Sequence, residues 1–189
     1  MKVLLIGPPG SGKGTQGTRL AEQLRVEHIA TGDLLRAEVA AQSEIGREVS
    51  SLLDRGELVP DSIVFDLVIP RVAAAAASGG YLLDGFPRSI DQAVEARKLA
   101  DQGDAAPDAV IYLDVDRDEL MRRILGRARK QGRTDDTEAT VEKRLTVFEE
   151  ATRPLVEYYR ERGLLSVIDA GQDQRAVTAA ILAVLGATS

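Results

Sequence analysis

The chain has 189 residues, of which 44% are hydrophobic and 29% are charged, so it is long enough for one well-packed domain of ordinary globular composition. Its formal net charge of −6 argues against a general nucleic-acid binder. Cys is absent, which excludes disulfides and cysteine-based zinc sites and fits a reducing cytoplasm, and no apolar run approaches the length of a membrane span or of a secretory signal.

Residues 2–6, with the sequence KVLLI, predict a short strand that is buried on both faces, as in parallel sheets. A glycine-rich turn with Lys13 inside it follows, and then a helical pattern. Glycines allow successive backbone N–H groups to point toward one place, and the helix N-terminus adds its dipole there, so such a turn binds phosphate oxygens. The spacing Gly7-x4-Gly12-Lys13 fits the phosphate-binding loop, except that the hydroxyl expected directly after the lysine comes one residue later, at Thr15. This turn therefore predicts nucleotide binding.

The rest of the chain alternates between strand and helix patterns. We expect further strands at 28–30, 81–84, 109–113 and 164–168, and helices at about 13–24, 31–41, 43–55, 61–77, up to 100, from 116, 137–162 and 173–185. Strands that alternate with helices imply right-handed crossovers and a parallel sheet between two layers of helices. In such a sheet, ligands bind beyond the carboxyl ends of the strands.

Asp84 ends the apolar run 81–84 and so comes at that edge of the sheet. A carboxylate beside a phosphate-binding loop is placed to hold Mg²⁺ through water. The alternative role of Asp84 is to cap the next turn.

Arg123 and Arg127 are four residues apart on one expected helix, so they share a face. Like charges at this spacing repel by a few tenths of a kcal/mol, roughly. A polyphosphate that bridges the two planar guanidinium groups would offset this repulsion. The alternative is a solvated helix surface.

Four further arginines predict where the anions bind. Arg133 and Arg144 could converge on the same anion as Arg123 and Arg127, while Arg36 and Arg88 would supply a second anion site.

Several motifs resemble those of the adenylate kinases. They are GPPGSGKGTQ at 7–16, TGDLLR at 31–36, DGFPR at 84–88 with Gln92, GRTDD at 132–136, and Lys143-Arg144-Leu145. They fall in order and span essentially the whole chain, and the displaced Thr15 is the usual form in that family. The resemblance implies an α/β fold: a P-loop three-layer sandwich with a five-stranded parallel sheet flanked by helices, a helical NMP-binding insertion and a short lid loop.

The resemblance also implies domains and an activity. Residues 1–29, 60–125 and 137–189 would form the P-loop core, 30–59 the NMP-binding region and 126–136 the short lid. The reaction would be reversible Mg²⁺-dependent phosphoryl transfer, ATP + AMP = 2 ADP, which maintains adenine nucleotide balance. Because water competes as acceptor, we expect 30–59 and 126–136 to close over the substrates. We expect no zinc.

The site residues follow from the same resemblance. The ATP-binding residues would be Gly10, Ser11, Gly12, Lys13, Gly14, Thr15, Arg123, Arg127 and Gln172. The AMP-binding residues would be Thr31, Arg36, Glu57, Leu58, Val59, Gly85, Phe86, Pro87, Arg88, Gln92, Arg133 and Arg144. The catalytic residues would be Lys13, Arg88, Arg127, Arg133 and Arg144, with Asp84 on the metal. The resemblance also suggests a cis peptide bond between Phe86 and Pro87.

Two other functions compete with this one. Uridylate-cytidylate kinases tend to have Ala where Thr31 stands and Asn where Gln92 stands, so these two residues favour AMP over UMP or CMP. A non-catalytic ATP-binding switch needs no second anion site, so it would leave four arginines without a role: Arg36, Arg88, Arg133 and Arg144. We therefore expect a cytoplasmic, monomeric kinase with ATP, AMP and ADP as its partners and no nucleic acid or membrane.

Overall fold

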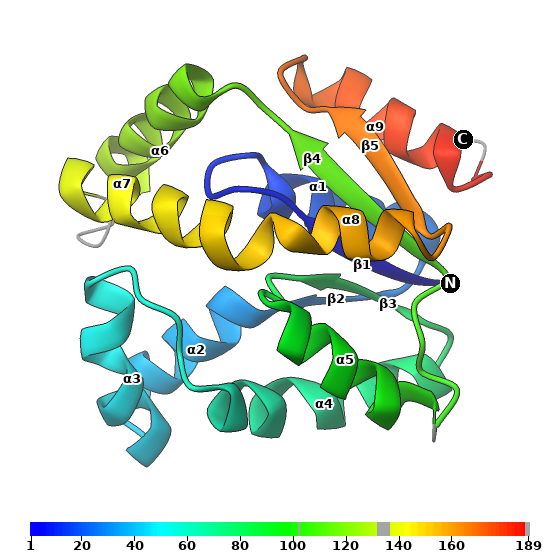
Figure 1. Cartoon of the computed structure of the whole chain (residues 1–189), viewed down its shortest axis with the longest axis horizontal. Helices are drawn as coiled ribbons and strands as arrows, with labels where there is room; N and C mark the ends of the chain where they lie inside the picture. Colours follow the sequence, from blue (N-terminus) through cyan, green and yellow to red (C-terminus); the bar gives the residue numbers. More distant parts are fainter. Residues whose placement is uncertain (102, 132–136, 188–189) are drawn as a thin grey trace.

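The computed structural model describes residues 1–101, 103–131 and 137–187 (Figure 1). The strands are β1 (Lys2–Ile6), β2 (Glu27–Ala30), β3 (Tyr81–Asp84), β4 (Ala109–Asp114) and β5 (Leu165–Asp169). The helices are α1 (Lys13–Leu24), α2 (Thr31–Ala40), α3 (Glu44–Asp54), α4 (Asp61–Ala77), α5 (Ile90–Asp101), α6 (Arg117–Gln131), α7 (Glu138–Val147), α8 (Pro154–Arg160) and α9 (Gln174–Val184), with a π-helical turn η1 (Phe148–Thr152) between α7 and α8.

The strands form one sheet in the order β2-β3-β1-β4-β5, and all of its pairs are parallel. β1 lies in the middle, where Leu4 pairs with Leu83 on one side and with Val110 on the other. The expected five-stranded parallel sheet is confirmed. Since all strands run the same way, the loops after β1, β3, β4 and β5 meet at one edge.

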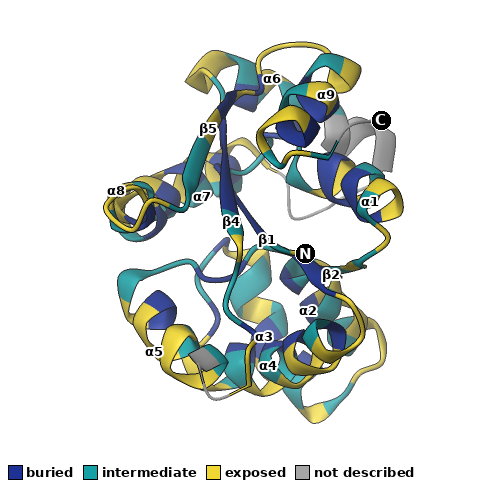
Figure 2. Ribbon diagram, turned by 90° about the vertical axis from the view of Figure 1, so that its right-hand side faces the viewer, coloured by how far each residue is buried: buried dark blue, intermediate teal, exposed yellow. Residues whose placement is uncertain are grey.

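Alternate residues of β1 pack into two different layers. Val3 and Leu5 lie in a core with Leu20 of α1 and Ile181 of α9. Leu4 faces the opposite core, which α4, α5 and α8 complete. Figure 2 shows β1 and β4 as buried strands between the helical layers. This two-sided burial explains why β1 and β4 are nearly continuous apolar runs without alternation.

The α2–α3 pair forms the first part of the region expected to bind the monophosphate. Ser43 caps α3, because its hydroxyl accepts a hydrogen bond of 2.9 Å from the backbone N–H of Gly46. The two helices cross closely at that point: a Cβ on Gly46 would lie 2.0 Å from the carbonyl oxygen of Glu38. Packing of α2 against α3 therefore depends on the bare glycine backbone.

The helices α7 and α8 join through η1 into one long rod, seen in yellow and orange in Figure 1. At the π-helical turn the backbone N–H of Arg153 donates to the carbonyl oxygen of Phe148 over 2.8 Å. Pro154, which lacks an N–H, starts α8 directly after it. The expected helix over 137–162 is thus present, with the irregularity at Pro154.

Pro70 lies inside α4, which nevertheless runs as one helix from Asp61 to Ala77. The expected lid, 126–136, begins inside α6, since this helix extends to Gln131, and its residues 132–136 lie outside the described part of the chain.

The peptide bond between Phe86 and Pro87 is cis, as expected. Within the described ranges, no helix is both long and apolar enough to cross a bilayer.

Candidate active site

The turn between β1 and α1 has the backbone of a phosphate-binding loop. Gly10 and Gly12 have φ values of 82° and 97°, which side chains with a Cβ rarely adopt. A Cβ on Gly10 would also lie 2.6 Å from Ile124, so α6 packs directly on the loop. Lys13 Nζ donates to the carbonyl oxygens of Gly7 and Pro8 at 2.8 and 3.0 Å, which holds its ammonium group at the loop.

Asp84 lies beside this loop at the carboxyl end of β3, where it pairs in register with Leu5 of β1. Burial raises the pKa of its carboxyl group, whereas the nearby charges of Lys13, His28 and Arg88 act in the opposite direction. The carboxylate therefore lies within electrostatic reach of both the lysine of the loop and Arg88. Among the described residues, no group of three or more His, Cys, Asp or Glu side chains could hold a metal ion. A single carboxylate fits Mg²⁺ that arrives with phosphates and keeps several waters, not an all-protein metal cage.

Arg88 is a half-buried cation in the loop that follows β3. Its Nε donates to the carbonyl oxygen of Gly85 over 2.9 Å. Burial lowers the pKa of its guanidinium group, Asp84 raises it, and the charges of Arg144 and Arg36 lower it further. Arg36 and Arg144, which come from two other segments, thus repel Arg88, and an anion bound between the three guanidinium groups would relieve that repulsion.

A small cavity of about 10 Å³ lies next to Arg88. Its lining residues come from α2, the loop before α4, α4 itself and the β3–α5 segment: Thr31, Leu35, Leu58, Val59, Val64, Gly85, Arg88 and Gln92. A nucleotide base is larger than this cavity, so its binding requires movement of the surrounding segments. A second cavity of about 100 Å³ lies between α4, α5, α8 and the sheet, but it is lined mostly by apolar side chains and is not near Lys13.

Besides Arg88, two polar side chains line the smaller cavity. The hydroxyl of Thr31 is buried and has no hydrogen-bond partner among the described residues. The amide of Gln92 accepts from the backbone N–H of Arg88 over 2.7 Å and donates to Asp61 Oδ1 over 2.6 Å. An apolar cavity with one hydroxyl and one amide suits a flat heterocyclic base.

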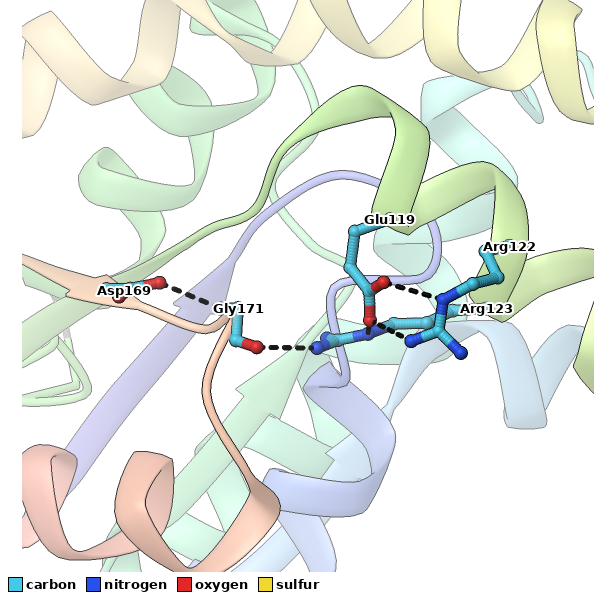
Figure 3. A network of polar contacts seen from close by, with 5 residues as sticks. All are labelled: Glu119, Arg122, Arg123, Asp169 and Gly171. Carbon is cyan, nitrogen blue, oxygen red and sulfur yellow. Dashed lines mark hydrogen bonds and ion pairs between the residues drawn. The ribbon is translucent and has the colours of Figure 1, made fainter.

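Arg123 connects α6 to the loop after β5 (Figure 3). Its Nε donates to Glu119 Oε1 over 2.6 Å, and its Nη2 lies 3.5 Å from the carbonyl oxygen of Gly171. The backbone N–H of Gly171 in turn donates to Asp169 Oδ1 over 2.9 Å. Glu119 also accepts from Arg122, whose side chain is 74% exposed against 26% for Arg123. Arg123, not Arg122, therefore faces the edge of the sheet where ligands bind.

The rod contacts the end of α3 and the segment that follows it. Arg144 Nη2 donates to the carbonyl oxygen of Leu53 over 3.3 Å, and Lys143 Nζ lies 2.6 Å from Glu57 Oε1. Arg55 binds the other carboxylate oxygen of Glu57 at 2.9 Å. Hydrogen bonds from Arg55 and Lys143 lower the pKa of Glu57 to about 2.

Comparison with known proteins identifies the family. A family model described as "Adenylate kinase" matches residues 5–164. An adenylate kinase of Kocuria rhizophila is 45% identical over 184 residues, which cover 97% of this chain and 98% of the relative. Adenylate kinases of Stenotrophomonas maltophilia (43% identity, 99% and 100% covered) and Thermobifida fusca (46%, 95% and 97%) match similarly. The chain belongs to the adenylate kinase family. It is an enzyme, a phosphotransferase with the α/β fold of P-loop kinases.

Half of the twelve residues expected on the AMP side lie together. The following line the small cavity: Thr31, Leu58, Val59, Gly85, Arg88 and Gln92. Phe86 and Pro87 instead line the larger apolar cavity on the other side of their loop. Arg36 forms an ion pair with Asp33 at 2.5 Å, and its side chain is 43% exposed. Glu57 binds Lys143 of the rod, and Arg144 of the rod donates to the carbonyl oxygen of Leu53.

The residues expected on the ATP side follow the sheet edge. Gly14 and Thr15 are exposed in the first turn of α1, while Ser11 is buried and its hydroxyl lacks a partner in the described structure. Gln172 donates to Asp169 over 3.2 Å in the loop that Arg123 contacts. The backbone at Arg127 belongs to α6, but its side chain is outside the described structure. Arg133 lies outside the described residues.

The sequence did not indicate several residues that surround these adenylate kinase positions. Asp61 begins α4 and binds the amide of Gln92, and Thr31 begins α2 without a capping hydrogen bond. Thr152 donates to the backbone of Arg88 from 64 residues away, for which no local pattern gives a signal. Lys143 was part of a motif, but its partner Glu57 could not be read from the spacing.

Proposed function

We propose that this kinase transfers a phosphoryl group reversibly between ATP and AMP, giving two molecules of ADP. The observation that carries the proposal is that the charges of Arg36 and Arg144 act on Arg88, while Asp84 lies within electrostatic reach of both Arg88 and Lys13. One cationic site would hold the ATP phosphates and the other the AMP phosphate. In-line transfer between them needs little covalent chemistry from the protein, because positioning and neutralisation of charge supply most of the catalysis.

The roles of the binding residues follow from their surroundings. The loop from Gly10 to Thr15 would hold the ATP phosphates with its N–H groups, and Lys13 would follow the transferred group. Arg88 would bind the AMP phosphate, with Arg36 and Arg144 on its other sides. Arg133, in the proposed lid 126–136, and Arg144 would grip the transferred phosphoryl group, and Arg127, with Arg123, would lie along the ATP side. Arg123 and Gln172 would lie along the adenosine of ATP.

The proposed base site is the cavity between α2 and the β3–α5 segment. The hydroxyl of Thr31 and the amide of Gln92 offer both a donor and an acceptor, as the N6 amine and ring nitrogens of adenine require. The backbone of Glu57, Leu58 and Val59 and that of Gly85, Phe86 and Pro87 would complete the AMP site. Because the cavity measures only about 10 Å³, the proposed NMP region 30–59 would have to move when AMP enters.

Mg²⁺ would enter with ATP. Adenylate kinases generally use this ion, and it supplies neutralisation of the charge that develops on the phosphates. Asp84, buried at the end of β3, would bind its water shell. We further propose a cytoplasmic monomer with ATP, AMP and ADP as its partners, and size-exclusion chromatography with light scattering tests the oligomeric state.

The experiment that tests the reaction supplies Mg·ATP together with AMP, UMP, CMP or GMP in turn and follows diphosphate formation. We expect the highest kcat/KM with AMP. Fast turnover with UMP or CMP and none with AMP would instead assign the chain to the uridylate-cytidylate type. ATP binding without turnover of any monophosphate would indicate a nucleotide-dependent switch.

A further inference from the structure

The peptide backbone of Arg88 is held on both of its sides. Its N–H donates to Gln92 Oε1 over 2.7 Å, and its carbonyl oxygen accepts a hydrogen bond of 2.8 Å from Thr152 Oγ1. Gln92 is a neighbour in sequence, whereas Thr152 comes from the rod, 64 residues away. We propose that Thr152 is a positioning residue of the AMP site, which fixes the backbone from which Arg88 projects.

The π-helical turn gives Thr152 this unusual partner. A Thr inside a regular helix commonly donates to the carbonyl four residues earlier, as Thr146 does to Glu142 in α7 at 3.1 Å. Thr152 ends η1, where one extra residue per turn widens the helix and changes the direction of the side chains. Its side chain is buried, with 7% of the residue exposed, and its hydroxyl leaves the rod to reach the β3–α5 loop.

Arg88 needs such an anchor because its guanidinium group lies among charges of both signs. Loss of hydration lowers its pKa, Asp84 raises it, and the charges of Arg144 and Arg36 lower it again. A fixed backbone keeps the guanidinium group in one place among these opposed charges. The hydrogen bond to Thr152 ties the loop to a long helical rod, which is a stiffer support than the loop itself.

The same rod also carries Arg144. Thr152 and Arg144 lie eight positions apart along α7 and η1, so one element holds the backbone of Arg88 and presents the second arginine to the same proposed phosphate site. Thr152 therefore keeps two arginines from distant segments in a fixed relation. Its loss should misplace Arg88 relative to Arg144 and weaken binding of the monophosphate, not of ATP.

A pair of substitutions separates this role from simple packing. Thr152→Val keeps the volume and removes the hydroxyl, whereas Thr152→Ser keeps the hydroxyl and removes a methyl group. We expect Thr152→Val to raise the KM for AMP by about 2- to 10-fold, the range for one lost hydrogen bond, and to leave the KM for ATP unchanged. Thr152→Ser should keep the KM for AMP near that of the wild type. If Thr152 serves only packing, the Ser variant should be the more impaired of the two.

Controls keep the test decisive. Thr146→Val removes a hydroxyl that bonds only within α7, so it should leave both KM values unchanged. If Thr152→Val does not fold, Thr152→Ala and Thr152→Ser differ by the hydroxyl oxygen alone and give the same comparison. A wild-type KM for AMP in the Val variant, or an equal rise in both KM values, would overturn the proposal. The inference rests on AMP binding at Arg88, and wild-type turnover with AMP tests that function separately.

Discussion

Lys143 of α7 and Glu57 of the loop after α3 form an ion pair, with 2.6 Å between Nζ and Oε1. The pair joins the rod to the region proposed to close over AMP, and the bond from Arg144 to the Leu53 carbonyl lies beside it. Lys143 is 45% exposed and Glu57 32% exposed, so the pair is partly screened by solvent. It is a weak contact at the place where this region is proposed to open and close.

Reversal of one charge tests this contact. Lys143→Glu puts two carboxylates opposite each other and should raise the KM for AMP by about 2- to 5-fold, as expected for a partly exposed pair. The double variant Lys143→Glu with Glu57→Lys restores opposite charges and should recover most of the affinity. Because salt screens such pairs, the difference should shrink at high ionic strength. A double variant that is no better than the single one would show that the pair does not hold the AMP region.

The same carboxylate predicts a pH range. Hydrogen bonds from Arg55 and Lys143 lower the pKa of Glu57 to about 2, below its ordinary value of 4.5. A carboxyl group with a lowered pKa stabilises the fold at pH values above the ordinary pKa, and this stabilisation is lost as the pH falls through the lowered pKa. The difference in Tm between the wild type and Glu57→Gln should therefore stay constant from about pH 8 to about pH 5 and change as the pH falls from about 5 toward about 2. A difference in Tm that stays constant below pH 5 as well would indicate an unshifted pKa.

Thr31 predicts opposite effects on stability and on binding. Its hydroxyl is buried without a partner in the described structure, so Thr31→Val should leave Tm unchanged or raise it. If the hydroxyl binds the base, the same variant should raise the KM for AMP by about 2- to 10-fold. Thr178→Val is the matched control, because the buried hydroxyl of Thr178 has partners. Its Oγ1 lies 2.7 Å from Gln16 Oε1 and 2.8 Å from the carbonyl oxygen of Gln174.

The control variant should lower the free energy of unfolding by about 1–2 kcal/mol and leave the KM for AMP unchanged. A loss of stability in Thr31→Val as large as that in Thr178→Val would mean that the Thr31 hydroxyl already has a partner. Thermal unfolding and steady-state kinetics on the same preparations provide both measurements.

The sequence could predict the parts of this molecule that depend on short spacing. The glycines around Lys13 and the apolar run before it identify β1, the loop and α1, because each signal lies within a few residues. The alternation of strands and helices was enough for the parallel sheet, since parallel strands require crossovers. Strand order was not predicted, because it depends on which apolar runs pair across long distances.

The partners of the polar side chains could not be predicted. Asp61 follows Pro60 at the start of a helix, which is a typical capping position, yet tertiary packing brings it to Gln92, 31 residues away. Thr152 carries no local signal, because a π-helical turn differs from an α-helix only in the extra residue. Such contacts depend on how the β3–α5 loop and the rod pack together, which no window of sequence contains.

We propose that two nucleotides bind this chain end to end, one at the glycine-rich loop and one at Arg88. The most direct measurement is a calorimetric titration with a dinucleotide in which one phosphate chain, long enough to span both sites, joins two adenosines. We expect one molecule to bind per chain and both ATP and AMP to displace it. Arg88→Lys keeps the charge but loses the planar fork, so it should weaken this binding by about 10-fold or more. Two molecules per chain, or displacement by ATP alone, would contradict the arrangement.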